Sequence, residues 1–153
     1  MKKQLLISAI AIASPFLFSA AAQAESTTGN ADVVILETIN FTEVAHVDFG
    51  SITNADGTCT MASNGALSGQ CAGRPAGTVG DFTVTGTSGQ AVNVSVGSGS
   101  TSGGVTFNPV LSSSATPTLV GGTTTVNVIG SLDLLSATAG AKALTYTLTV
   151  DYQ

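Results

Sequence analysis

The sequence predicts an all-β fold, an antiparallel β-sandwich of about eight or nine short strands. Val and Thr, which favour strands, recur in alternating blocks along the chain, whereas the helix formers Glu, Lys and Gln are scarce. Gly-rich segments separate the blocks, as turns do between strands. Because apolar residues return in every block, the Gly and Ser content indicates turns and not disorder.

The N-terminal 24 residues have the three regions of a secretory signal peptide. Lys2 and Lys3 precede an apolar run, LLISAIAIASPFLFSA, and the small-x-small sequence Ala22-Gln23-Ala24 follows it. A membrane anchor is the alternative, but Pro15 interrupts the run and no basic cluster follows. We therefore expect a cleaved signal peptide over residues 1–24, then one β-sandwich domain over residues 25–153 with no integral membrane segment. The protein is expected in the periplasm, at the cell surface or outside the cell.

The exported part is strongly acidic. Without Lys2 and Lys3, only Arg74 and Lys142 remain against nine acidic residues, a net charge of −7. Two basic residues are too few to bind a phosphate backbone, so nucleic acid is excluded as a partner. An anionic membrane surface would repel such a chain for the same reason.

A strand over residues 31–41 is expected to open the fold. Its VVIL stretch, residues 33–36, is expected to be buried on both faces because apolar residues occupy consecutive positions. In the following stretch, AHVDFGSI, the alternation turns Val47 and Phe49 inward.

The stretch VGDFTVTGTSGQAVNVSV predicts a β-hairpin with a three-residue loop. Gly89 would take the left-handed position that such a loop needs. This register places Val84 opposite Val92 and Phe82 opposite Val94, all on one face.

Further strands are predicted in GGVTFNPVL and GGTTTVNVIGSLDLL. In the second, Val126, Val128, Leu132 and Leu134 keep one parity through Gly130, which indicates a single long strand with a bend. The core of the sandwich is expected to include Phe49, Phe82, Val84, Val94 and Leu148.

The closing stretch, ALTYTLTVDYQ, alternates without a break. One face carries Leu144, Tyr146, Leu148, Val150 and Tyr152, and the other carries threonines and an aspartate. A chain that stops on a strand has no following strand to protect that edge. These five residues are therefore the candidate face for pairing with a partner.

Cys59 and Cys71 are the only cysteines, and they are predicted to form a disulfide in an oxidising compartment. A hairpin turning about Gly65 would set the two directly opposite each other. Two cysteines and one distant histidine are too few soft ligands for a metal site.

We expect no catalytic, cofactor or metal site, and no enzymatic activity. His46 is the only histidine, and neither a nucleophile elbow nor a P-loop motif occurs. The NADG sequence at residues 54–57 resembles part of a calcium loop, but Ile52 occupies the first ligand position. Asp48, Asp81 and Asp151 are spread through strands and are expected to be solvated.

Four short motifs, in order, resemble the DUF4402 family of exported bacterial β-proteins. They are VDFGSI at 47–52, FTVTG at 82–86, LVGGTTTV at 119–126 and YTLTVDYQ at 146–153. The resemblance covers nearly all of residues 25–153 and implies an exported β-protein of a Gram-negative bacterium, with its activity left open. The cysteine pair and the AGAKALTY turn depart from the family pattern.

The C-terminal strand also resembles that of chaperone–usher pilin subunits, which often have a penultimate tyrosine like Tyr152. This resemblance implies an immunoglobulin-like or pilin-like sandwich that pairs with a periplasmic chaperone or with copies of itself by strand addition. Ala31, Val33 and Ile35 form an alternating run that would serve as a donor. The alternative is that residues 31–41 complete the sandwich of their own molecule, and for the monomer the sequence favours this alternative slightly.

The sequence therefore predicts an exported, non-enzymatic structural protein, a pilin-like (fimbrial) or cell-surface-associated subunit. The rival class is an adhesin that recognises a glycan or host ligand. Trp is absent and the Phe and Tyr residues fall in strand-like segments, whereas adhesive sites usually place aromatic residues on loops.

Overall fold

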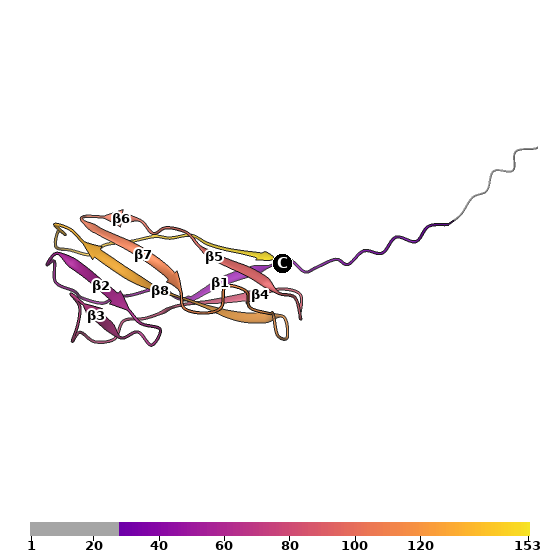
Figure 1. The fold of residues 1–153 in the computed structure, drawn as a ribbon, viewed down its shortest axis with the longest axis horizontal. Helices are drawn as coiled ribbons and strands as arrows, with labels where there is room; N and C mark the ends of the chain where they lie inside the picture. Colours follow the sequence, from indigo (N-terminus) through magenta and orange to yellow (C-terminus); the bar gives the residue numbers. More distant parts are fainter. Residues whose placement is uncertain (1–27) are drawn as a thin grey trace, which may run out of the picture. The chain divides into compact units, whose positions relative to one another are not determined.

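The computed structural model describes residues 28–153 and confirms an antiparallel β-sandwich of nine strands in two sheets (Figure 1). No helix occurs among these residues. The internal contacts divide the chain between Val33 and Val34. Residues 28–33 contain no strand, and all nine strands belong to the unit that begins at Val34. The expected signal peptide lies outside the described residues.

Seven strands form the large sheet. Its main path runs β1-β4-β8-β2-β3, with β7 paired to β8 and β6 paired to β7. The strands are β1 (Asn40–Ala45), β2 (Gly57–Met61), β3 (Leu67–Gly69), β4 (Gly80–Thr85), β6 (Thr101–Ser102), β7 (Val105–Leu111) and β8 (Thr123–Leu134).

Strand β8 organises the large sheet, as its position between β4, β2 and β7 in Figure 1 shows. Its first half pairs with β4, and its second half pairs with both β2 and β7. The predicted single strand through Gly130 is confirmed. A side chain at Gly130 would collide with the Asn108 carbonyl and the Phe107 ring, so glycine lets β7 lie close at this point.

The small sheet consists of β5 (Val92–Val96) and β9 (Leu148–Tyr152). Residues 115–119 run along the other edge of β5, where the Pro117 and Ala115 carbonyls accept hydrogen bonds from Val92 N and Val94 N. Apolar side chains of both sheets meet in one cluster around Phe82. A second cluster, around the disulfide, joins residues of β2, β7 and β8 to Phe49 and Ala137 from the loops. Of the five residues expected in the core, four are buried and Leu148 is half-buried.

The predicted hairpin of residues 82–96 is wrong. Strand β4 pairs with β1 and β8 in the large sheet, whereas β5 pairs with β9 in the small sheet. The intervening loop crosses between the sheets, with Gly89 at φ 79°. The expected burial of the apolar residues is nevertheless correct, because the inner faces of both sheets point into the same core.

The expectation for residues 31–41 is also wrong. Strand β1 begins only at Asn40, and residues 34–39 form no strand. Val34 and Ile35 are 83% and 86% exposed and Leu36 is half-buried, so VVIL is not buried on both faces. These residues therefore do not complete the sandwich of their own molecule.

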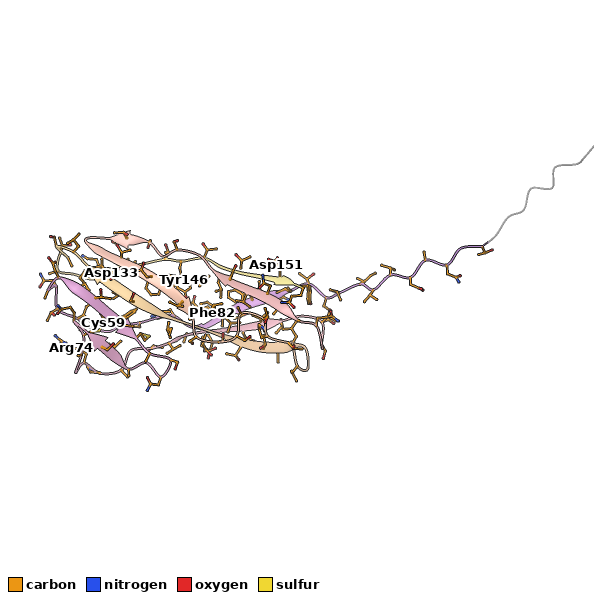
Figure 2. All side chains as sticks on the ribbon, viewed as in Figure 1. Cys59, Arg74, Phe82, Asp133, Tyr146 and Asp151 are labelled. Atoms are coloured by element: carbon orange, nitrogen blue, oxygen red, sulfur yellow. A yellow bond between two sulfur atoms is a disulfide. The ribbon has the colours of Figure 1, made fainter. Side chains whose placement is uncertain are left out.

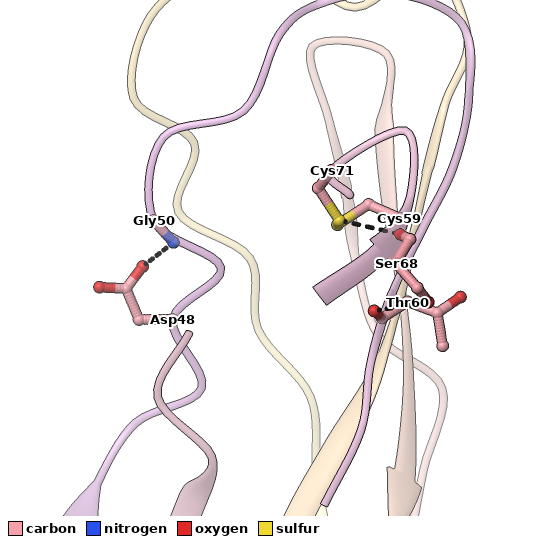
Figure 3. Close-up of a disulfide and its surroundings, with 6 residues drawn as sticks. All are labelled: Asp48, Gly50, Cys59, Thr60, Ser68 and Cys71. Atoms are coloured by element: carbon pink, nitrogen blue, oxygen red, sulfur yellow. Dashed lines mark hydrogen bonds between the residues drawn. A yellow bond between two sulfur atoms is a disulfide. The ribbon is translucent and has the colours of Figure 1, made fainter. Parts of the chain in front are cut away.

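The predicted Cys59–Cys71 disulfide is present (Figure 3), but the two cysteines are not directly opposite each other in a hairpin as predicted. In the β2–β3 hairpin Cys59 pairs with Gly69, not with Cys71. A turn closed by the bond from Ala72 N to the Gly69 carbonyl then brings Cys71 back, with Cα atoms 5.2 Å apart. Both cysteines are fully buried. The disulfide indicates an oxidising, extracytoplasmic location.

Candidate assembly groove

A long groove opens into the core of the sandwich. One wall is β1 with the loop of residues 46–54, and the other is the segment 137–148. Its volume is about 1060 Å³. The floor consists of inward-facing side chains of the large sheet: Phe82, Val105, Phe107, Leu132 and Leu134. The groove thus exposes the apolar interior of the fold.

The groove is open because the inner face of β1 is incompletely covered. Phe41 and Glu43 pair with Val84 and Phe82, so they lie on the core-facing side of the sheet. Phe41 stacks on the Phe82 ring, with centroids 5.0 Å apart and planes 5° apart. Yet Phe41 remains 40% exposed. The small sheet, with two described strands, is too narrow to cover β1.

Each of the strands β1 and β9 has one edge without a strand partner among the described residues. Strand β1 pairs only with β4, and β9 pairs only with β5. An open strand edge presents backbone N–H and C=O groups that an extended chain can pair with. An apolar floor and open edges are therefore found in the same part of the molecule.

The predicted pairing face lies partly in the groove. Leu144, Tyr146 and Leu148 line it, whereas Val150 and Tyr152 pack in the cluster around Phe82. All five are half-buried, and the residues between them are exposed, as the alternation predicts. The regular strand, however, begins only at Leu148. The preceding segment is held by bonds between residues 145–147 and residues 97–100.

Tyr146 lines the groove and packs against both apolar clusters. Its ring meets Phe82 edge-to-face at a centroid distance of 6.3 Å (both residues are labelled in Figure 2), and it meets Phe107 in the same way at 5.5 Å. Its hydroxyl has no hydrogen-bond partner among the described residues. Burial, and secondly the nearby Glu43 carboxylate, raise the pKa of Tyr146 to about 12. The phenol therefore stays neutral and offers an unused donor and acceptor in an apolar setting.

Tyr152 lies outside the groove and forms a different contact, which we call the Tyr152 clasp. Its hydroxyl donates a hydrogen bond to the Glu37 carbonyl (2.8 Å) and accepts one from Thr87 N (2.6 Å). Glu37 N in turn donates to Thr87 Oγ1 (2.6 Å). A side chain at Gly86 would collide with the Tyr152 hydroxyl, so glycine makes room for the clasp.

Sequence reasoning missed the wall formed by β1 and residues 46–54, and it missed the clasp. One signal for the wall was available. Glu43 falls on the same parity as Phe41, two residues beyond the end of the predicted strand, so continuing that strand puts a charge on its core-facing side. Carboxylates are rarely buried without a partner, so this face had to be open. No comparable signal marked the clasp.

Residues 28–153 contain no cluster of three or more His, Cys, Asp or Glu side chains that could hold a metal ion. Within the same range, no helix is long and apolar enough to cross a membrane. His46 and Asp48 line the rim of the groove, but Asp48 is engaged locally, its Oδ1 accepting a bond from Gly50 N at 2.7 Å (Figure 3).

Comparisons of the chain with protein-family models, with curated proteins and with solved structures each find no match.

Proposed function

We propose that this protein is an exported, non-enzymatic structural subunit, pilin-like or cell-surface-associated, that assembles by strand addition. The observation that carries the proposal is the groove between β1 and residues 137–148, where the apolar core opens beside strand edges that no other described strand pairs with. The occupant is the segment of residues 31–36 from a second copy of the chain. A periplasmic chaperone would occupy the same groove before assembly.

The form of the groove favours a polypeptide strand. In strand addition, backbone pairing with an open edge supplies affinity, and pockets for alternate side chains supply register. Its volume of about 1060 Å³ lies at the upper limit of small-molecule pockets, which typically span about 300–1,000 Å³. Each wall of the groove is an extended segment of chain, so a bound strand could lie alongside both walls.

The chain carries a segment that suits this site. Val33, Val34 and Ile35 are each more than 80% exposed, and Leu36 after them is half-buried. Large exposed apolar residues in a row mark interaction sites. The alternation of Ala31, Val33 and Ile35 matches the demand of a groove that accepts every second side chain.

Export is the second part of the proposal. A signal peptide over residues 1–24 would deliver the chain to the periplasm, and from there to the cell surface or the medium. The resemblance to the DUF4402 family and to pilins supports the same route. The shortage of Lys and Arg leaves few sites for proteases that cut after basic residues, which suits a protein exposed outside the cell.

The direct test is the mass of the assembled protein. Residues 25–153 and a variant lacking residues 25–36 would be exported, purified and compared by light scattering over a range of concentrations. The full chain should form species heavier than a monomer, and the shortened chain should remain monomeric because it has no donor. Both should keep the strand content of the fold by circular dichroism.

A full chain that stays monomeric at every concentration, alone and when isolated from its own periplasm, would contradict the proposal. A monomer that instead retains a glycan on an array would favour the rival class, an adhesin. A complex with a periplasmic protein that disappears on adding an excess of the peptide of residues 28–36 would support the chaperone step.

A further inference from the structure

The Tyr152 clasp bears on which molecule fills the groove. Glu37 is held through both of its backbone groups, the N–H by Thr87 Oγ1 and the carbonyl by the Tyr152 hydroxyl. Thr87 follows β4, and Tyr152 is the last residue of β9. The clasp therefore joins the ends of one strand from each sheet and fixes the chain three residues before β1 begins.

For residues 31–36 to fill the groove of their own chain, they would have to run beside β1. A parallel arrangement needs a crossover of a dozen or more residues, and only residues 37–39 are available. The segment would therefore have to form a hairpin with β1 and reverse direction at residues 37–40. Such a turn rotates the peptide groups of Glu37, which the clasp holds in place.

We infer that the Tyr152 clasp prevents the chain from filling its own groove and so commits residues 31–36 to the groove of a second copy. This inference rests on the proposed strand addition and identifies what directs it between molecules. Residue 37 can either turn into the hairpin or be held in the clasp, but not both. The clasp therefore favours the monomer whose groove is open. In an open monomer the groove stays empty and the donor stays free, so assembly depends on concentration.

The test uses a photo-crosslinking residue, p-benzoylphenylalanine, at position 35 of the full chain of residues 25–153. Three further changes are compared with this parent. Tyr152→Phe keeps the ring and removes the hydroxyl that bonds Glu37 and Thr87. Thr87→Val removes the acceptor of Glu37 N from the other side. Thr106→Val is the matched control, because it removes a hydroxyl bonded at 2.9 Å to Thr101, at a half-buried position of β7 that does not itself line the groove.

Crosslinks between chains and within a chain are then separated by mass, and the attached peptides are identified. The parent and Thr106→Val should give links between chains, from position 35 to peptides of the groove walls. Tyr152→Phe and Thr87→Val should raise the ratio of links within the chain to links between chains by about tenfold, the effect expected when one or two neutral hydrogen bonds are lost.

An unchanged ratio in both clasp variants, with links between chains in the parent, would overturn the role of the clasp and leave the proposed function standing. A parent that gives no links between chains, and no mass above a monomer, would overturn the proposed function and this inference with it. If position 35 of the parent already crosslinks mainly to the groove of its own chain, the proposed role of the clasp is refuted, whereas the groove remains a site for strand addition.

Discussion

Phe41 and Phe82 stack on each other and both line the groove, but Phe82 is buried in its floor whereas Phe41 is 40% exposed in its wall. Phe82 is 6% exposed, with its ring against Tyr146 as well as Phe41. Phe82→Ala should lower the free energy of unfolding by about 3–5 kcal/mol, because it leaves a cavity in the core. Phe41→Ala should cost the monomer about 1 kcal/mol, because much of its ring already meets water.

Urea unfolding of the variant lacking residues 25–36 would measure both changes without interference from assembly. In the full chain, Phe41→Ala should weaken assembly more than its small effect on monomer stability suggests, because Phe41 forms part of the wall that a donor would contact. A loss below about 1 kcal/mol for Phe82→Ala would show that Phe82 does not fill the core.

Tyr146 predicts a dependence of stability on alkaline pH. Its pKa is raised from 10.0 to about 12 in the folded protein. Between these values the unfolded chain releases the proton while the folded chain retains it, so the unfolded state binds fewer protons and stability falls as pH rises. Below about pH 10 both states hold the proton, and this group contributes no pH dependence.

Urea midpoints measured from pH 8 to pH 11 would test this sign, with Tyr146→Phe as the comparison. The native midpoint should fall above pH 10, and the variant should lose part of that fall. The variant also removes a hydroxyl that has no hydrogen-bond partner within residues 28–153, so its midpoint at pH 8 should equal or exceed the native one. Identical alkaline profiles would show that the phenol is not protected from ionisation.

At the scale of elements, the hairpin β2–β3 and its disulfide form a unit that depends on the covalent bond. Strand β3 has three residues and, within residues 28–153, pairs only with β2. Replacing both cysteines with alanine should lower the free energy of unfolding by about 2–3 kcal/mol, from the entropy of an open short loop in the unfolded state. Replacing both with serine should cost more, because the sites are fully buried and the hydroxyls would need partners.

Denaturant unfolding of both double variants would check this order, and a thiol assay before and after reduction would check the bond. The purified native chain should contain no free thiol. A serine variant as stable as the alanine variant would show that water reaches this end of the core.

The elements also show where sequence reasoning succeeds and where it stops. Alternation located β4, β5, β7, β8 and β9, and for all of them except β7 it also identified which face is buried. It could not tell a hairpin from a crossing between sheets, because Phe82 and Val94 face the same core in both arrangements. The disulfide pairing followed from composition, whereas the register that forms it depended on the turn after Gly69.

Only one of the two walls of the candidate site was predicted from the sequence, for a related reason. The face of Leu144, Tyr146 and Leu148 follows from period-2 alternation alone. The opposite wall depends on how far the small sheet extends over β1, which is a property of the whole fold. An apolar run such as VVIL has the same pattern whether it lies in a core or waits for a partner, so its exposure could not be predicted.

At the scale of the whole molecule, a filled groove should make the protein more stable by mass action. A synthetic peptide of residues 28–36, added to the chain lacking residues 25–36, should raise the free energy of unfolding as its concentration increases. At a hundred times the dissociation constant the gain should be about 2.7 kcal/mol. The reason is that the peptide would bind only the folded state, whose groove walls come from distant parts of the chain.

Two control peptides test whether the gain comes from a strand bound in register. Changing Val33 and Ile35 to Ser removes the side chains that alternation directs into the groove, and it should abolish the stabilisation. Changing Val34 alone to Ser alters the opposite face of the strand and should leave most of it. Equal effects of the two control peptides would show non-specific apolar binding. No gain from the native peptide at millimolar concentration would mean that the groove takes a different occupant, since a strand that pairs along one edge and fills alternate pockets has to bind more tightly than that to support assembly.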